Sequence, residues 1–147
     1  MAGEKGNFNS IGFLEMIFQA VQTASYVGLV RNDTSPITTL YVSLHTGDPT
    51  ASGNQSSNEA AYTGYVRIAV ARSSGSWSIS NETITNVSTV NFPACTSGSE
   101  TESYVGVGTA ASGPGVLLWA GPLISGLAIT PGITPSFAAG ALQITEG

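Results

Sequence analysis

Apolar and polar residues alternate along two segments of the chain, 40–45 and 65–70. Because successive side chains of a β-strand point to opposite faces, each segment should form a strand with one buried face and one exposed face. In the first segment Ser43 and His45 share the polar face. In the second segment Arg67 occupies a polar position, so the pattern predicts that its side chain points outward.

The remainder of the chain after residue 38 also has the pattern of short strands separated by turns. Further strands are predicted over 77–79, 83–92, 103–109, 116–120, 127–130 and 141–145. Clusters of Gly, Pro, Asn and Ser lie between them and are typical of turns. Roughly eight short strands at this spacing predict an all-β fold, a single β-sandwich or jelly-roll-like domain.

One stretch near the N-terminus has helical periodicity instead. Apolar residues recur there at spacings of three and four: Ile11, Leu14, Ile17, Phe18 and Val21. With Ser10 as N-cap, this pattern predicts a helix over 10–24 that covers the core or packs on a neighbouring subunit, of which covering the core is favoured. Residues 1–9 are polar and contain glycine, so we expect a flexible or docking arm ahead of one domain over 10–147.

Charge is scarce and unevenly distributed. Only 9% of the 147 residues are charged, against about a quarter in an ordinary soluble domain. Between Ser103 and Thr145 there is no charged residue at all. Because edge strands are usually protected by charges, this stretch indicates either edges covered in a homo-oligomer or strands at the centre of the domain's own core.

Composition also argues against several partners and compartments. The net charge is −5 and the four basic residues are scattered, so we expect no nucleic-acid partner. No apolar run approaches the roughly 18 residues of a membrane span, and no secretory leader is recognisable. Cys95 is the single cysteine, and we expect it to be a small buried residue. We expect no cofactor and no metal.

Catalytic patterns are weak. His45 is the only histidine, and although Ser43 shares its strand face, Asp48 begins a turn and is not placed to orient the imidazole. A strand-terminal histidine that faces solvent or an interface is the preferred interpretation, and we predict no enzyme activity. Gly106, Gly108 and Ala111 fit a GxGxxA pattern, but a helix-breaking turn follows, which favours a strand leading into a turn over a nucleotide site.

Two groups of residues carry side-chain oxygens that can bind a cation. Glu100 and Glu102 are two residues apart, hence on one strand face, and could hold a divalent cation or act as paired carboxylates. A solvated strand end is the favoured interpretation. The polar loop 46–62 could also supply oxygens to Ca²⁺, from Asp48, Asn54, Asn58 and Glu59, but without the spacing of an EF-hand.

The segment 40–49, LYVSLHTGDP, resembles a family of small virion proteins of tailed bacteriophages, commonly labelled tail fibre proteins and similar in size and predicted fold to capsid decoration or cement proteins. The likeness continues in order through 64–70, 90–95, 105–107, 109–113, 117–123 and 137–142. Each block is a strand with its adjoining turn, so the resemblance implies a shared fold and transfers no active-site residue. It implies a protein on the particle surface, made in the bacterial host cytoplasm.

Two functions follow from this resemblance. The leading hypothesis is a capsid decoration or cement protein, a homo-oligomer that bridges major capsid proteins and stabilises the assembled head. A short chain filled by one domain, without fibrous repeats, favours it. The candidate docking residues, in the arm and on the broad helix face, are Phe8, Ile11, Phe13 and Met16.

The alternative hypothesis is a tail or head-fibre module, attached to tail or fibre proteins, that binds a host surface receptor or glycan. Carbohydrate sites combine stacked aromatic rings with polar loop residues. The candidate receptor-facing residues are Tyr62, Tyr65 and Tyr104, with the loop 46–62 as one wall. A third function, a depolymerase, lacks a convincing acid/base pair.

Overall fold

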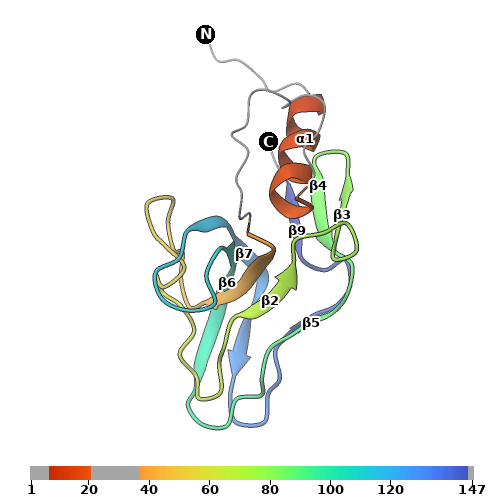
Figure 1. Ribbon diagram of the computed structural model, residues 1–147. Helices are drawn as coiled ribbons and strands as arrows, with labels where there is room; N and C mark the ends of the chain where they lie inside the picture. Colours follow the sequence, from red (N-terminus) through yellow and green to blue (C-terminus); the bar gives the residue numbers. More distant parts are fainter. Residues whose placement is uncertain (1–6, 21–36, 146–147) are drawn as a thin grey trace. The chain divides into compact units, whose positions relative to one another are not determined.

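The computed structural model describes residues 7–20 and 37–145, and for residues 7–10 only the backbone (Figure 1). Strands dominate and one helix lies near the N-terminus, so the prediction of an all-β fold with an N-terminal helix is confirmed. In chain order the elements are α1 (Asn7–Phe18), β1 (Thr39–His45), β2 (Ile68–Ala71), β3 (Trp77–Ser80), β4 (Thr83–Asn86), β5 (Val90–Asn91), β6 (Glu100–Gly108), β7 (Leu117–Ile129), β8 (Ser136–Phe137) and β9 (Gln143–Thr145).

The chain forms two compact units, each assembled from segments that are distant in sequence. Unit 1 comprises residues 1–38, 71–88 and 138–147, and unit 2 comprises 39–70 and 89–137. The sequence pattern did not reveal this division, because strands of both units have the same apolar alternation and turn composition. No helix in the described residues is long and apolar enough to cross a membrane.

Unit 2 contains a four-stranded sheet in the order β2-β1-β6-β7 and a two-stranded sheet, β5-β8. β6 pairs antiparallel with β1 on one side and with β7 on the other. The face of β1 with Leu40, Val42 and Leu44 is fully buried, as the alternation predicted. The opposite face is buried as well from Ser43 onward, because loops fold over it.

β7 joins two stretches that the sequence pattern separated. We expected strands at 116–120 and 127–130, with a turn between them. In the structure the pairing with β6 passes from Tyr104↔Pro122 directly to Glu102↔Leu127. Residues 123–126 therefore form a wide bulge opposite a single β6 residue, and the strand bends without leaving the sheet.

Unit 1 contains the sheet β3-β4-β9 and the helix α1, which packs on β3. Phe18 meets Trp77 edge to face, with ring centroids 4.8 Å apart. Leu14, Phe18 and Trp77 are all fully buried. The predicted core-covering role of the helix is therefore confirmed. The Asn86 side chain ties three strand ends together by donating to the carbonyls of Ser88 and Ala138 and accepting from the amide of Leu142.

The helix begins at Asn7 and ends at Phe18, whereas the pattern predicted 10–24. Ala20 has a φ of 56°, in the left-handed region that ends helices. The Arg72 guanidinium binds the carbonyls exposed at this end: its Nε donates to Ile17 O at 2.5 Å and its Nη2 donates to Met16 O. Nη1 donates to Ile37 O at 2.6 Å. Residues 21–24 of the predicted helix lie outside the described residues.

Candidate functional site

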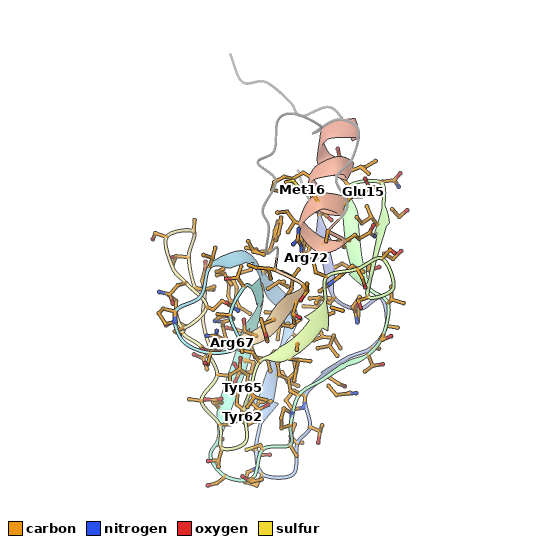
Figure 2. The ribbon with its side chains drawn as sticks, viewed as in Figure 1. Glu15, Met16, Tyr62, Tyr65, Arg67 and Arg72 are labelled. Atoms are coloured by element: carbon orange, nitrogen blue, oxygen red, sulfur yellow. The ribbon has the colours of Figure 1, made fainter. Side chains whose placement is uncertain are left out.

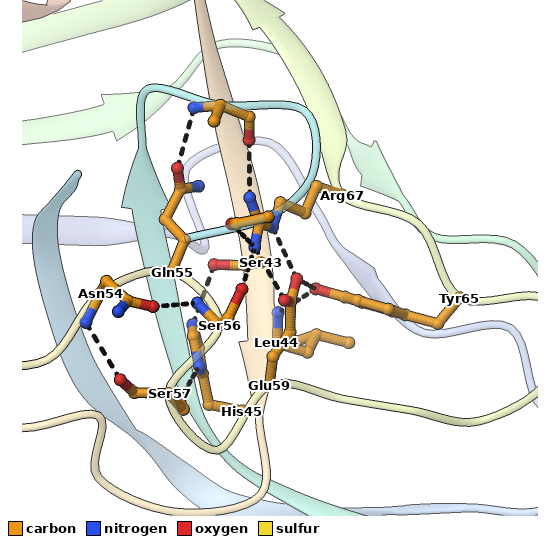
Figure 3. A network of polar contacts seen from close by, with 12 residues as sticks. Ser43, Leu44, His45, Asn54, Gln55, Ser56, Ser57, Glu59, Tyr65 and Arg67 are labelled. Atoms are coloured by element: carbon orange, nitrogen blue, oxygen red, sulfur yellow. Dashed lines mark hydrogen bonds and ion pairs between the residues drawn. The ribbon is translucent and has the colours of Figure 1, made fainter. Parts of the chain in front are cut away.

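A network of buried polar groups lies in unit 2, where the loop 46–62 and the turn 109–116 meet over β1 and β6 (Figure 3). The amide of Gln55 donates to Gly115 O at 3.0 Å, which joins the two segments directly. The remaining links are made by side chains. Because the segments are irregular, they cannot pair all their backbone groups with each other, and buried side chains satisfy several of them.

Arg67 is the centre of this network, and the prediction that it points outward is wrong. Its side chain is 1% exposed and forms a bidentate ion pair with Glu59, with Nε–Oε1 at 2.6 Å and Nη2–Oε2 at 2.7 Å. β2 begins only at Ile68, so Arg67 precedes the regular strand and the alternation does not apply to it. The neighbouring Val66, expected to be buried, is 55% exposed instead.

The same guanidinium also holds the turn 109–116. Nη1 donates to Ala110 O at 2.9 Å, and Nη2 donates to Gly113 O at 2.7 Å. A weaker contact runs from Nη2 to the Ser56 hydroxyl at 3.3 Å. A planar guanidinium presents five donors in a fixed fork, so one side chain can hold a carboxylate and several carbonyls at once. Arg67 thereby fixes both loops relative to the sheet.

Tyr65 extends the network toward β1. Its hydroxyl donates to Glu59 Oε1 and accepts from the amide of Leu44, both at 3.1 Å. Burial, with the adjacent Glu59 carboxylate, raises the pKa of Tyr65 well above its ordinary value, so the hydroxyl keeps its proton. The ring packs edge to face on Tyr62 and stacks on Phe92. Tyr65 is therefore half-buried, and its polar end is already engaged.

His45 is fully buried, so the prediction that it faces solvent or an interface is wrong. Its Nδ1 lies 2.8 Å from Ser57 O, and its Nε2 lies 2.9 Å from Ser43 Oγ. A carbonyl only accepts, so Nδ1 carries the proton and Nε2 accepts from the Ser43 hydroxyl. Burial lowers the pKa of His45, which keeps the ring neutral, although the Ser57 carbonyl acts in the opposite direction.

The hydrogen bond between Ser43 and His45 is of the kind that joins a catalytic nucleophile to its base, but a substrate could not reach either side chain. Both side chains are 0% exposed. Asp48 does not orient the ring, since its Oδ1 accepts from the amide of Thr50. The prediction that these three residues form no triad is confirmed. The pair instead links the end of β1 to the loop 46–62.

The glycines of the GxGxxA pattern make room for this network. A Cβ on Gly106 would lie 2.7 Å from His45 Nε2 and 2.8 Å from Ser43 Oγ. A Cβ on Gly108 would lie 2.2 Å from Gln55 Cδ. Both glycines belong to β6 and lead into the turn, as the sequence analysis favoured. The two glycines are two residues apart because other side chains come close to the backbone at both positions, on one face of the strand.

Gln55 is a fully buried member of the network that the sequence analysis missed. Its Oε1 accepts from the amide of Ala110 at 2.8 Å. Its Nε2 is buried without a hydrogen-bond partner among the described residues. No local pattern singles out one glutamine in a polar loop, because its partner lies 55 residues away in the chain. The sequence pattern indicated Glu59 only as a Ca²⁺ ligand, and it did not single out Ser57.

The other proposed Ca²⁺ ligands are used within the loop. Asn54 Oδ1 accepts from the amide of Ser56, and Asn58 Nδ2 donates to Asp48 O, each at 2.8 Å. The Glu59 carboxylate is paired with Arg67. Over residues 7–20 and 37–145, no group of three or more His, Cys, Asp or Glu side chains is arranged to hold a metal ion. The loop's oxygens therefore stabilise its own conformation.

Glu100 and Glu102 differ sharply from a solvated strand end. Glu100 is half-buried, and its Oε1 accepts from the amides of Ala61 and Tyr62, both at 2.8 Å. Glu102 is 0% exposed, and neither of its carboxyl oxygens has a hydrogen-bond partner in the described structure. Burial, with the nearby Glu100 adding to the effect, raises the pKa of Glu102 to about 8. At neutral pH Glu102 is therefore mainly the uncharged acid.

The predicted receptor-facing tyrosines are not equivalent. Tyr62 is 4% exposed and its hydroxyl donates to Pro93 O at 3.1 Å, so it does not present its ring at the surface. Burial raises its pKa to about 12. Tyr65 lies beside it (Figure 2), engaged as described above. Tyr104 is half-buried in β6, opposite Pro122 of β7. The three rings do not form an exposed aromatic platform.

The predicted docking residues all lie on α1. Ile11, Phe13 and Met16 are half-buried in the helix, while its fully buried positions are Leu14 and Phe18. Phe8 belongs to the first turn of the helix and not to an arm, and its side chain is outside the described residues. Cys95 is 1% exposed, as predicted for a small buried residue.

Comparison with known protein families identifies the class of protein, which the fold alone does not. The chain is a bacteriophage virion structural protein of the fibre type. The matching family is described as "Podophage GP4 fiber I protein gp80", and its model covers residues 21–145. The chain belongs to this family. A search of curated proteins found no match.

The family match confirms the phage virion class and the fibre-like part of the resemblance. It provides no resemblance to capsid decoration proteins. A family of structural fibre proteins also agrees with the absence of an accessible acid/base pair at the network, among the residues that the structure describes.

Proposed function

We propose that the chain is a non-enzymatic module of a phage fibre, attached to other tail or fibre proteins, that contacts the host surface through the loop 46–62 and the turn 109–116. The single observation that carries this proposal is the Arg67 guanidinium, which binds Glu59 of the loop and two carbonyls of the turn. Two irregular segments are thereby fixed to one sheet. Loops on a rigid scaffold are the usual location of binding residues.

Pre-organisation is the physical reason to connect this network with binding. Ordering a mobile loop during association costs free energy, and a loop that is already ordered avoids that cost. The buried side chains Gln55, Arg67 and His45 hold both segments from below. Outside, the turn exposes Ala111, Ser112, Gly113 and Pro114, and the loop exposes Thr50, Ala51, Ser52 and Ser56.

The exposed loop surface suits an uncharged ligand rich in hydroxyl groups. Its side chains are small and mostly neutral, with hydroxyls at Thr50, Ser52 and Ser112. A host surface glycan offers matching hydroxyl groups, so recognition would depend on hydrogen bonds from side chains and backbone. Tyr62 does not contribute a stacking surface, because its ring is buried.

Attachment to the capsid, the leading hypothesis from the sequence, is less well supported. The family description names a fibre protein, and none of the contacts above specifies a capsid protein as the partner. The half-buried helix residues Ile11, Phe13 and Met16 remain candidates for contact with neighbouring virion proteins.

Competition for host cells tests the proposal. The purified chain should inhibit adsorption of the phage to its host, and Ser112→Trp should weaken that inhibition roughly tenfold by blocking the turn. Ser136→Trp, at an exposed serine of β8 outside both loops, is the matched control and should inhibit like the wild type. Circular dichroism checks that both variants fold.

Inhibition that is equal for the wild type and both variants would remove the loops from the contact surface. A folded wild-type chain that binds isolated phage heads and leaves adsorption unchanged would overturn the proposal in favour of a capsid role.

A further inference from the structure

His45 is a buried titratable side chain that joins the end of β1 to the loop 46–62, which begins at the next residue. Its Nδ1 donates to Ser57 O at 2.8 Å, and its Nε2 accepts from the Ser43 hydroxyl at 2.9 Å (Figure 3). Both ring nitrogens are therefore occupied by neutral partners, one in the loop and one on the strand. A change in the charge of this ring acts directly on the contact between the loop and the strand.

Main-chain hydrogen bonds on both sides of the ring hold the loop against β1. Thr46 N donates to Asn58 O at 2.8 Å, and Ala60 N donates to Leu44 O at 2.9 Å. β1 itself is paired with β6 along a continuous ladder, residues 41–45. Because the loop is held by isolated bonds and the strand by a ladder, the loop can open while the strand remains in the sheet.

The position of the ring does not suit a positive charge. His45 is 0% exposed, so water does not solvate an imidazolium there. β6 lies directly against the ring, because a Cβ on Gly106 would be 2.7 Å from Nε2. A second proton on Nε2 therefore places a charge between a serine hydroxyl and the backbone of β6. The closed loop disfavours this proton, and burial lowers the pKa of His45 accordingly.

Within the described part of the chain, the two charges that act on the ring are Glu59 and Arg67, and they act in opposite directions. Glu59 forms a β-bridge with His45, and its carboxylate favours the imidazolium. That carboxylate is bound by both Nε and Nη2 of Arg67, whose charge disfavours the imidazolium. Because the two charges offset each other, this ion pair does not compensate a charge on His45.

The other titratable side chains described near the ring are uncharged in acid. Tyr104 of β6 lies opposite His45, and a tyrosine carries no charge at acidic pH. The Tyr65 hydroxyl, which is bound to Glu59, keeps its proton. Glu102, two residues before Tyr104 in β6, is mainly the uncharged acid at neutral pH and below. None of these groups therefore stabilises an imidazolium in the closed loop.

We propose that His45 is an acid-sensitive switch: a second proton on the ring releases the loop 46–62 from the end of β1. With the loop open, the ring reaches water and binds the proton with its ordinary pKa of 6.5. Because the closed loop binds this proton less readily, the closed state is favoured above pH 6.5 and loses stability as the pH falls below it. The proposal concerns the conformation of the loop and does not depend on the proposed host contact.

NMR spectroscopy of the full chain between about pH 7.5 and pH 4.5 tests the proposal. The chain has a single histidine, so its ring signals are assigned without ambiguity. As the pH falls below about 6.5, hydrogen exchange of the Thr46 and Ala60 amides, corrected for the intrinsic effect of pH, should accelerate by up to about tenfold per pH unit. Amides between β1 and β6 should stay protected. Loop amides that remain equally protected over the whole range, whether or not the ring is protonated, would overturn the proposal.

His45→Gln is the matched variant, because a glutamine offers donors and an acceptor but does not titrate. It keeps Glu59 and Arg67, so an effect of acid on their ion pair is the same in both chains. Its loop amides should lack the acceleration below pH 6.5, and circular dichroism checks its fold. An equal acceleration in the folded variant would show that acid acts through another group. Should the variant not fold, ring protonation and loop opening in the wild type must share one midpoint, and separate midpoints would overturn the proposal.

Discussion

Two arginines five residues apart, Arg67 in unit 2 and Arg72 in unit 1, organise their units in different ways. Arg67 combines a bidentate ion pair with hydrogen bonds to two turn carbonyls. Arg72 donates to the carbonyls of Met16, Ile17 and Ile37. Both side chains satisfy backbone acceptors where regular secondary structure ends. Arg67 must in addition neutralise the half-buried Glu59 carboxylate.

The difference predicts unequal consequences of losing each arginine. A half-buried carboxylate that loses its cation is only partly solvated, and its charge is left without compensation. A helix end that loses its donor still reaches water where it is exposed, and Arg72 is itself only half-buried. The two units can be followed separately, because Trp119 lies in unit 2 and Trp77 lies in unit 1.

Arg67→Met should have the largest effect. We expect the free energy of unfolding of unit 2 to fall by about 3–5 kcal/mol, because Glu59 would be left without its ion pair. Urea unfolding monitored by fluorine NMR of the fluorotryptophan-labelled chain would show an early transition at Trp119. Adding Glu59→Met should restore part of the loss. Equal destabilisation of the single and double variants would show that the ion pair is not the cause.

Glu59 is paired with a cation, whereas the carboxyl group of Glu102 has no hydrogen-bond partner in the described residues. The pKa of Glu102 is raised from 4.5 to about 8 in the folded chain. Between these values the unfolded chain has lost the proton and the folded chain keeps it. Glu102 should therefore contribute a loss of stability to unit 2 as the pH rises through this window, by at most about 1.4 kcal/mol per pH unit, and the loss should level off above it. The lowered pKa of His45 contributes the opposite trend below about pH 6.5.

Glu102→Gln retains the shape and removes the titrating group. Its unit 2 should be more stable than the wild type near pH 8 and similar near pH 4, by urea unfolding at each pH. Glu100→Gln is the control: it leaves Glu102 in place, so a pH dependence should remain. A stability difference between the wild type and Glu102→Gln that does not change between pH 5 and pH 8 would contradict a protonated Glu102, since both chains share the contribution of His45.

Arg72→Met should have the smallest effect of the three. Unit 1 would lose three hydrogen bonds, two of them at the helix end and one to Ile37 O, and we expect a loss of about 1–2 kcal/mol confined to this unit. The Trp77 signal should shift to lower urea while Trp119 keeps its transition. A loss as large as that of Arg67→Met would remove the distinction between the two arginines.

Local regularity was predictable from the sequence, and the site was not. The alternation around Leu40–Leu44 gave β1 and placed Ser43 and His45 on one face, and the helical spacing gave the buried positions Leu14 and Phe18. The end of the helix depends on Arg72, 55 residues from Ile17. A window of ten or twenty residues contains no information about such a contact.

The same limit explains the error at Arg67. Alternation assigns faces only within a regular strand, and Arg67 stands one residue before β2 begins. Its burial follows from Glu59 and from the carbonyls of Ala110 and Gly113, which lie 43 and 46 residues further along the chain. The glycines at 106 and 108 were a visible signal of crowding on β6. The sequence alone does not show which side chains cause this crowding, because they come from distant parts of the chain.

Arg67 holds the turn 109–116 through main-chain oxygens, so the hold does not depend on which side chains the turn carries. Residues 111, 112 and 114 can change without removing a hydrogen bond to the guanidinium. The contacts that fix the turn are thus separate from the side chains that the turn exposes. On the proposed host contact, changes at these three positions would alter the contact surface and leave the hydrogen bonds of Arg67 in place.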